Sequence, residues 1–436
     1  MNYDINDKSP GRLFEAAMLG DADTLLYLIK AEAKLNCKDF CGWTALMIAA
    51  FNAHSEQTVK LLIDAGADVN SADKDSMSVL MAAAAGGNAE IVKIVTAAGP
   101  DLDACDRHGN TALHYIFFEN YYGNLYRYCP QFSIMSENYH KESFFKIARH
   151  IIDAGADYNK KNRNGMSALM CAAYSGAGEI IHYVISKEDG RDIGFEELII
   201  TAAGSPCIER SAGIIEFLIS AGKRRKNIDI NAKHSKLSRT ALMNACIAGN
   251  NGAVKTLIAS GADPDEKDEN NATALMHAAA KGNYENFESL FEITSDPRAV
   301  DSNGKTVLDY AMNPGPYDKL NFMAIDKLIK NNFKFKGDPK EEMPKIMFRA
   351  AREGNLYVLK LLIDSGTDIN CPDWRGWTPL MEAINHICHS GNFAAAEFLI
   401  GRGTDLEKCD RHGWNALMLA IEKGHYGLAS ILIERS

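Results

Sequence analysis

The stretch Gly42-Trp43-Thr44-Ala45-Leu46-Met47-Ile48-Ala49-Ala50 decides the fold, because close versions of it return three times further along the chain. They are Gly109-Asn110-Thr111-Ala112-Leu113, Gly376-Trp377-Thr378-Pro379-Leu380-Met381 and Gly413-Trp414-Asn415-Ala416-Leu417-Met418. Anchored on the leucine, the first four repeats lie at 13, 46, 80 and 113, which gives steps of 33, 34 and 33 residues. A period of this length indicates supersecondary repeats stacked into a solenoid.

Each repeat has the pattern of two helices joined by a turn. Thr44 stands just before the apolar run, where its hydroxyl can accept from the unpaired amides of the first helical turn. Val59, Leu62 and Ile63 share one face of a second helix, and Gly66 is placed to end it. The capping slot recurs as Thr44, Ser78, Thr111, Ser167, Thr240, Thr273, Thr306, Thr378 and Asn415.

The repeat from Asp39 to Asn70 resembles an ankyrin repeat. The family pattern Asp-x-x-Gly-x-Thr-Pro-Leu-His, two helices and Gly-Ala-Asp-x-Asn is matched by Asp39, Gly42, Thr44, Leu46, Ala49, Ala50 and Gly66-Ala67-Asp68-Val69-Asn70. His114 keeps the family histidine, which is methionine at Met47, Met81, Met170, Met243, Met276, Met381 and Met418. We expect these methionines to fill space between helices rather than to form a binding face. The resemblance implies an all-α ankyrin-repeat solenoid of paired antiparallel helices with short β-hairpin tips.

Twelve such repeats cover nearly the whole chain. Repeats one to nine are assigned to 1–329, a charged linker or joint to 330–345, and repeats ten to twelve to 346–436. Repeat six carries a small insertion around 204–213. Repeat four is interrupted by an aromatic insertion, about 119–143, that either packs over the helices it interrupts or projects as a platform for a partner.

Composition limits the classes of function. The net charge is −10 and the pI is about 5.7, so the chain as a whole gives no reason to expect polyanion binding. The run Lys223-Arg224-Arg225-Lys226 leaves nucleic-acid or polyanion binding as an alternative, although a solvated loop is the favoured interpretation. No signal peptide or membrane span is recognisable, which predicts a cytoplasmic protein, with signal-less export as an effector that binds a host protein left open.

The sequence predicts no enzyme. It contains no Gly-rich phosphate loop, no nucleophile elbow and no His-Glu-x-x-His helix, so we expect no catalytic residue, cofactor or small-molecule substrate. Ten cysteines without a Cys-x-x-Cys pair favour reduced, part-buried thiols over a metal site. The acids at Asp39, Asp73, Asp106, Asp268, Asp301, Asp373 and Asp410 occur once per repeat, and the resemblance implies that each stabilises its hairpin and the neighbouring one.

Binding of another protein, by a chain that is monomeric alone, is the predicted function. In ankyrin proteins partners are usually bound by the hairpin tips and by exposed positions late in the first helices, on the concave face. Carried onto this chain, and with tyrosines of the insertion added, the candidate contacts are Phe40, Trp43, Phe51, Arg107, His108, Phe118, Tyr121, Tyr122, Tyr126, Tyr128, Tyr174, Trp374, Arg375, Trp377, His386, Arg411, His412 and Trp414.

All four tryptophans fall on hairpin tips, and tryptophan and arginine dominate interface hot spots. For Trp43, Trp377 and Trp414 the alternative is packing of the indole on the adjacent hairpin. Trp374 does not occupy that position, because it follows the hairpin aspartate rather than the glycine. With Arg375 beside it, it makes the best single patch in the sequence for a protein-interaction scaffold or adaptor.

Overall fold

The computed structural model describes residues 10–117, 141–187, 192–225, 228–234, 238–312, 322–331, 339–387 and 392–435. Within these residues there are 24 helices and two isolated β-bridges, Ala72 with Ser78 and Lys161 with Ser167. The fold is therefore all-α, as the sequence predicts. The chain divides into an amino-terminal unit, 1–234 with 240–262, and a carboxy-terminal unit, 235–239 with 263–436, and each is described by itself.

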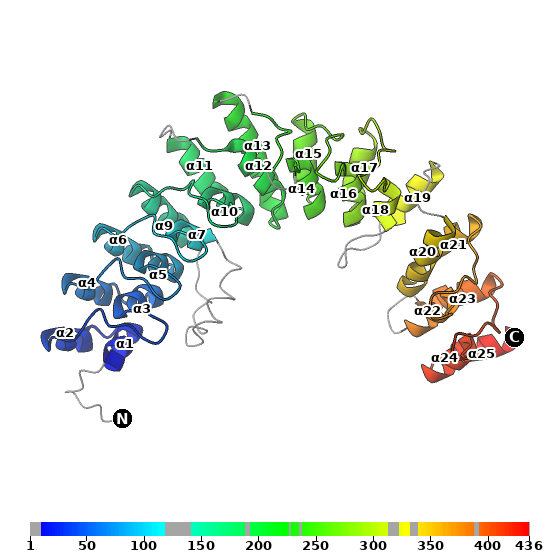
Figure 1. Cartoon of the computed structure of the whole chain (residues 1–436), viewed down its shortest axis with the longest axis horizontal. Helices are drawn as coiled ribbons and strands as arrows, with labels where there is room; N and C mark the ends of the chain where they lie inside the picture. The colour runs from blue at the N-terminus through cyan, green and yellow to red at the C-terminus, as the bar shows by residue number, and fades with distance from the viewer. Residues whose placement is uncertain are drawn as a thin grey trace. The chain divides into compact units, whose positions relative to one another are not determined.

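The amino-terminal unit stacks helix pairs in chain order (Figure 1). The first helices of its repeats contact one another in succession, and so do the second helices. The first helices are α1 (Pro10–Leu19), α3 (Ala45–Asn52), α5 (Val79–Gly86), α7 (Ala112–Phe117), α10 (Ala168–Ser175), α12 (Phe195–Ala203) and α14 (Ala241–Ala248). The second helices are α2 (Ala22–Lys30), α4 (Glu56–Asp64), α6 (Ala89–Ala97), α9 (Lys141–Asp153), α11 (Gly178–Lys187), α13 (Ile208–Arg225) and α15 (Asn251–Ala259).

The carboxy-terminal unit repeats this arrangement in five helix pairs. Its first helices are α16 (Ala274–Lys281), α18 (Val307–Met312), α20 (Pro339–Glu353), α22 (Pro379–Asn385) and α24 (Ala416–Glu422). The second helices are α17 (Tyr284–Phe291), α19 (Phe322–Lys330), α21 (Leu356–Asp364), α23 (Asn392–Gly401) and α25 (Tyr426–Arg435). Helix α22 packs between α20 and α24, which places three consecutive first helices side by side.

The predicted caps start most of the first helices. The Thr44 hydroxyl accepts from the Met47 amide at 3.3 Å, and Ser78, Ser167, Thr240, Thr306, Thr378 and Asn415 accept in the same way. Thr273 makes no such side-chain bond. At Thr111 the geometry is reversed, because the backbone amide of Thr111 donates to Nδ1 of His114 at 3.1 Å. The recurring slot therefore fixes the helix starts by more than one bonding pattern.

The recurring methionines fill the core, as predicted. Met47, Met81, Met170, Met243, Met276 and Met381 are all buried, with exposed fractions of at most 4%. Met418, in repeat twelve, is 50% exposed. Its position differs because no later helix pair in the described chain packs against α24.

Two predictions about repeat six are wrong. Lys223, Arg224 and Arg225 do not lie in a loop but form the last turn of α13, where cations are favourable beside the negative end of the helix dipole. Lys223 and Arg224 are exposed, as expected, and Lys226 lies outside the described residues. The extra residues predicted at 204–213 do not form an insertion between the helices either, because α13 starts at Ile208 and runs for 18 residues.

Two features stay predictions. The core of the aromatic insertion, with Phe118, Tyr121, Tyr122, Tyr126 and Tyr128, lies outside the described residues. Part of the predicted joint at 330–345 also does, although Pro339 to Lys345 belong to helix α20. No helix among the described residues is long and apolar enough to cross a membrane.

Candidate functional site

The described hairpins are built around one acceptor side chain, which is a carboxylate in all but repeat five. Asp373 Oδ1 accepts from the backbone amides of Arg375 and Trp377, both at 2.8 Å, and the Asp373 amide donates to the Trp377 carbonyl at 2.9 Å. The same pair of side-chain bonds is made by Asp39, Asp73, Asp106, Asp268, Asp301, Asp410 and, in repeat five, Asn162. The structural role predicted for the hairpin acids is therefore confirmed.

Neighbouring hairpins in repeats eleven and twelve are bonded to each other. Trp377 donates its indole N–H to Asp410 Oδ2 at 3.2 Å, and the Arg411 amide donates to the Arg375 carbonyl at 3.1 Å. Gly376 has φ +84°, and a Cβ there would lie 3.1 Å from the Arg411 amide nitrogen, so glycine permits this close approach. The result is a continuous row of hairpin tips that holds the tryptophans and arginines in place.

Trp374 projects from this row with 76% of its surface exposed. The guanidinium carbon of Arg375 lies 4.1 Å from the centre of the Trp377 ring and 5.7 Å from that of Trp374. A guanidinium at these distances is attracted to the electron-rich ring faces. The structure thus gathers Trp374, Arg375 and Trp377 at one tip, as the sequence predicts.

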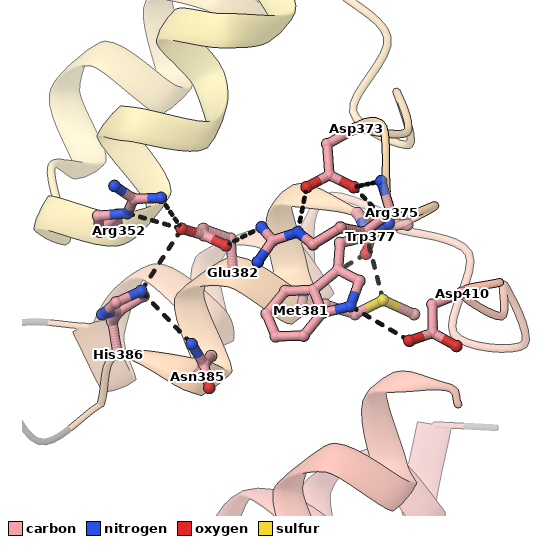
Figure 2. A network of polar contacts seen from close by, with 10 residues as sticks. Arg352, Asp373, Arg375, Trp377, Met381, Glu382, Asn385, His386 and Asp410 are labelled. Carbon is pink, nitrogen blue, oxygen red and sulfur yellow. Dashed lines mark hydrogen bonds and ion pairs between the residues drawn. The ribbon is translucent and has the colours of Figure 1, made fainter. Parts of the chain in front are cut away.

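A buried acid lies beneath this tip. Glu382 is 1% exposed, and its Oε2 accepts from Nη2 of Arg375 at 3.0 Å while its Oε1 accepts from Nε of Arg352 at 2.6 Å (Figure 2). Nε2 of His386 lies 3.5 Å from Oε1. Burial lowers the pKa of Arg375, but its bonds to Asp373 and Glu382 outweigh burial and hold the pKa above its usual value. The acid therefore fixes both arginines with their outer parts turned to solvent: their side chains are 55% (Arg352) and 32% (Arg375) exposed.

Arg352 and Glu382 are the residues that sequence reasoning missed. Glu382 stands in the run Leu380-Met381-Glu382-Ala383, at a position that holds Ile48 or Ala82 in some repeats and Glu15, Asn244 or His277 in others. Because polar residues are common at this position, the acid carries no distinctive signal in the sequence. Arg352 carries none either, because its role depends on the packing of α20 against α22.

A small cavity lies beside Trp377. Its volume is about 180 Å³ and its lining comprises Trp377, Met381, Asp410, His412, Trp414, Asn415, Leu419 and Glu422. Pockets for small molecules usually measure about 300–1,000 Å³. The cavity therefore suits one side chain of a protein partner better than a metabolite. Trp414, 40% exposed, and the exposed His412 belong to this lining, and the exposed Arg411 precedes His412 on the same hairpin.

The candidates in repeat two behave differently. Trp43 is 2% and Phe51 6% exposed, and their rings meet edge to face with centres 5.5 Å apart. The Trp43 indole donates to Asp73 Oδ2 at 3.0 Å. For Trp43 the burial favours the packing alternative over partner contact, and Phe51, predicted as a partner contact, is covered with it. Phe40, at the same tip, is 71% exposed.

The remaining described candidates in the amino-terminal unit are Arg107, His108 and Tyr174. Arg107 pairs with Asp75 at 2.7 Å, and its Nε donates to Nε2 of the exposed His108 at 3.0 Å. Tyr174, on α10, is 45% exposed. None of them adjoins a cluster like the one around Glu382 in the part of the unit that the structure describes.

The described cysteines and possible metal ligands are scattered. No group of three or more histidine, cysteine or acidic side chains in the described chain is placed to hold a metal ion, and the described cysteines are free thiols. Burial raises the pKa of Cys171 and of Cys371, in each case to about 12, so these thiols stay protonated at neutral pH. Cys409 is exposed, unlike its counterparts in other hairpins.

Comparison with known proteins identifies the repeats. Models described as "Ankyrin repeats (3 copies)" match 13–104, 54–125, 207–301, 242–334, 319–408 and 346–436, and one described as "Ankyrin repeats (many copies)" matches 142–185.

Three similar proteins show how far the likeness extends. The mitochondrial disaggregase of Bos taurus is 27% identical over 180 residues, which are 40% of this chain and 22% of the relative. Inversin of Gallus gallus is 38% identical over 100 residues, 23% of this chain and 9% of inversin. The ankyrin repeat and KH domain-containing protein mask-1 of Caenorhabditis elegans is 26% identical over 268 residues, 58% of this chain and 10% of that protein. The chain thus covers less than a quarter of each relative, while the family models match most of its length. It belongs to the ankyrin repeat family.

Proposed function

We propose that this chain is a non-enzymatic scaffold that binds another protein through the hairpin tips and first helices of repeats ten to twelve. Ankyrin repeats generally mediate protein–protein interaction. The contact surface that we assign comprises Arg352, Trp374, Arg375, Trp377, Arg411 and Trp414, and we call it the tryptophan–arginine surface. The observation that carries the proposal is the 76% exposure of Trp374 beside a guanidinium that is itself held by a buried acid.

Physical arguments support this surface over the others. A large exposed aromatic ring next to an ordered arginine is the composition of an interface hot spot, because both residues bury much area on binding. Arg375 is already fixed by Asp373, Glu382 and the Trp377 ring, so ordering it on binding costs little side-chain entropy. By contrast, Trp43 and Phe51 are already buried within the fold, so a partner could cover little more of their apolar surface.

The test is affinity capture of partners from the native cell by the full chain and by Trp374→Ala. Capture should fail or fall strongly with Trp374→Ala, while the free energy of unfolding stays within about 0.5 kcal/mol because the side chain is exposed. Phe40→Ala is the matched control, since Phe40 follows Asp39 as Trp374 follows Asp373 and is similarly exposed.

A second variant extends the test. Replacing Trp374 and Trp377 together by alanine removes both rings that face Arg375, and we expect it to weaken binding further. Capture that is unchanged by both variants, or that is lost only with Phe40→Ala, would refute the proposal.

A further inference from the structure

The tryptophan–arginine surface has an uneven distribution of charge with depth. Its acids lie below the surface: the side chain of Glu382 is 1% and that of Asp373 13% exposed. Asp410 is engaged by the amides of His412 and Trp414 and by the indole of Trp377. These acids therefore interact mainly with the protein's own amides, indole and guanidinium groups rather than with solvent.

The cations lie above them. The Arg352 and Arg375 side chains are 55% and 32% exposed, and Arg411 and His412 are exposed on the next hairpin. A guanidinium carries five N–H donors, and Arg375 uses its Nε for Asp373 and its Nη2 for Glu382. Two further acids lie nearby: Glu353 accepts from Arg349 at 3.3 Å, and Glu422 is exposed at the cavity. The charged groups that face solvent beside Trp374 are thus mainly guanidinium groups, while Glu382 and Asp373, which balance two of them, are turned inward.

The cavity between Trp377 and Trp414 adds a site for an apolar group. At about 180 Å³ it holds a single side chain, and Trp377, Met381, Trp414 and Leu419 supply apolar walls. Trp377 belongs to both parts, because it lines the cavity together with Asp410 while the guanidinium of Arg375 lies over its ring (Figure 2). One short segment of a partner can therefore reach both parts.

We propose that the tryptophan–arginine surface receives an acidic segment of the partner protein, with one apolar or aromatic side chain in the cavity and neighbouring carboxylates at Arg375, Arg352 and Arg411. This inference rests on the proposed function and adds the chemistry of the partner to it. Carboxylates match the planar donor pairs of arginine, which favours bidentate bonds over contact with a neutral segment. Glu422, on the cavity side, repels acids there and directs them toward the arginines.

The experiment selects peptides from a random display library on the full chain and measures the affinity of the selected peptides. We expect peptides enriched in aspartate or glutamate next to leucine, phenylalanine, tyrosine or tryptophan, whose binding weakens as salt is raised. Arg411→Gln and Arg375→Gln should each weaken binding roughly tenfold, the change that corresponds to loss of one strong charged contact. Arg411→Gln keeps the test valid if Arg375→Gln perturbs folding, because Arg411 is exposed.

Arg402→Gln is the matched control. Arg402 lies over the Phe398 ring at 5.1 Å and pairs with Asp364 at 3.3 Å. Like Arg375, it thus contacts an aromatic ring and a carboxylate, but it lies outside the tryptophan–arginine surface. It should leave peptide affinity unchanged. Equal losses for Arg402→Gln and Arg411→Gln would overturn the inference.

Other outcomes distinguish failure of this inference from failure of the proposed function. If the selected peptides are neutral or basic but still lose binding with Trp374→Ala, the acidic partner is refuted and the proposed function survives. If no selected peptide responds to Trp374→Ala, the proposed function fails as well. If single-stranded DNA binds and is lost with Arg411→Gln while acidic peptides are not enriched, the surface binds nucleic acid and the inference is overturned.

Discussion

Two hairpins of the same construction, 39–43 in repeat two and 373–377 in repeat eleven, have different surroundings. In both, an aspartate accepts from the amides two and four residues on, and the tryptophan indole donates to the aspartate of the next hairpin. In the first, Trp43 is buried against Phe51. In the second, Trp377 is only half-buried, and the guanidinium of Arg375 lies on its ring.

Two slots account for the difference. The slot of Phe51, late in the first helix, holds Asn385 in repeat eleven, so no second ring closes over Trp377. The slot of Cys41 holds Arg375, whose charge is fixed by Glu382 where repeat two has Ile48. The repeat pattern thus fixes the backbone of the hairpin and the hydrogen bond of the indole, while a few variable positions decide whether the tryptophan is buried in the stack or left partly exposed.

The largest expected effect distinguishes the two indoles. Trp43→Ala should lower the free energy of unfolding by about 3–5 kcal/mol, because it leaves a cavity beside Phe51 and an unpaired Asp73 oxygen. Trp377→Ala should cost clearly less, because its ring is partly solvated. Chemical denaturation of the full chain, followed by circular dichroism, measures both, and equal losses would break the comparison.

The shared scaffold predicts equal losses at the leucine anchor. Leu46 and Leu380 are 1% and 0% exposed in the same slot, so Leu46→Ala and Leu380→Ala should each destabilise by about 2–5 kcal/mol. The same denaturation experiment checks them. A loss of stability for Leu46→Ala without one for Leu380→Ala would mean that the two leucines are not packed equivalently in their repeats.

Replacing the buried acid tests what is specific to repeat eleven. Glu382→Gln keeps the shape of the side chain but removes the charge that holds Arg352 and Arg375, and we expect a loss of about 1–3 kcal/mol. Partner affinity should fall as well, since the arginines are no longer fixed. Ile48→Val, in the same slot of repeat two, is the control and should leave affinity unchanged while costing about 0.5–1.5 kcal/mol of stability.

The two aspartates that accept from the indoles should respond to pH in opposite directions. Burial raises the pKa of Asp73 despite its bonds to Met77, Asp75 and Trp43. Burial acts in the same direction on Asp410, but bonds from Trp414, His412 and Trp377 outweigh it and lower the pKa. Asp73 therefore disfavours folding as pH rises through its folded pKa, whereas Asp410 favours folding above its unfolded pKa and loses that contribution as pH falls through its folded pKa.

Asp73→Asn and Asp410→Asn isolate these small effects, and Asn162 shows that asparagine fits the slot. As pH falls from neutral into the acid range, the stability of the unmodified chain relative to Asp73→Asn should rise, and its stability relative to Asp410→Asn should fall. Denaturation at several pH values gives both slopes. If the two stability differences changed with pH in the same direction, the opposite pKa shifts of Asp73 and Asp410 would be wrong.

Much of the fold could be predicted from the sequence, because every local signal repeats with the same period. The caps at Thr44 and Thr378, the core methionines and the hairpin acids all carry that signal. The start of α13 in repeat six is not predictable for a physical reason: without a hairpin, nothing in the sequence marks where this helix begins, so its first turn resembles an insertion.

The candidate site was predictable only in part. Trp374 and Arg375 are visible as departures from the repeat pattern, and the structure brings them together. Arg352 could not be found, because it reaches Glu382 from another repeat at a sequence separation of 30 residues. Trp43 and Trp377 are alike in sequence, and only the contents of distant slots show which one is covered.

Hydrogen exchange of the full chain, alone and with a captured partner, distinguishes binding at repeats ten to twelve from binding at repeat two. We expect slower exchange on binding at the amides of 374–377 and 411–414, with no change at 40–43. Protection at 40–43, or none in repeats ten to twelve, would contradict the proposed function.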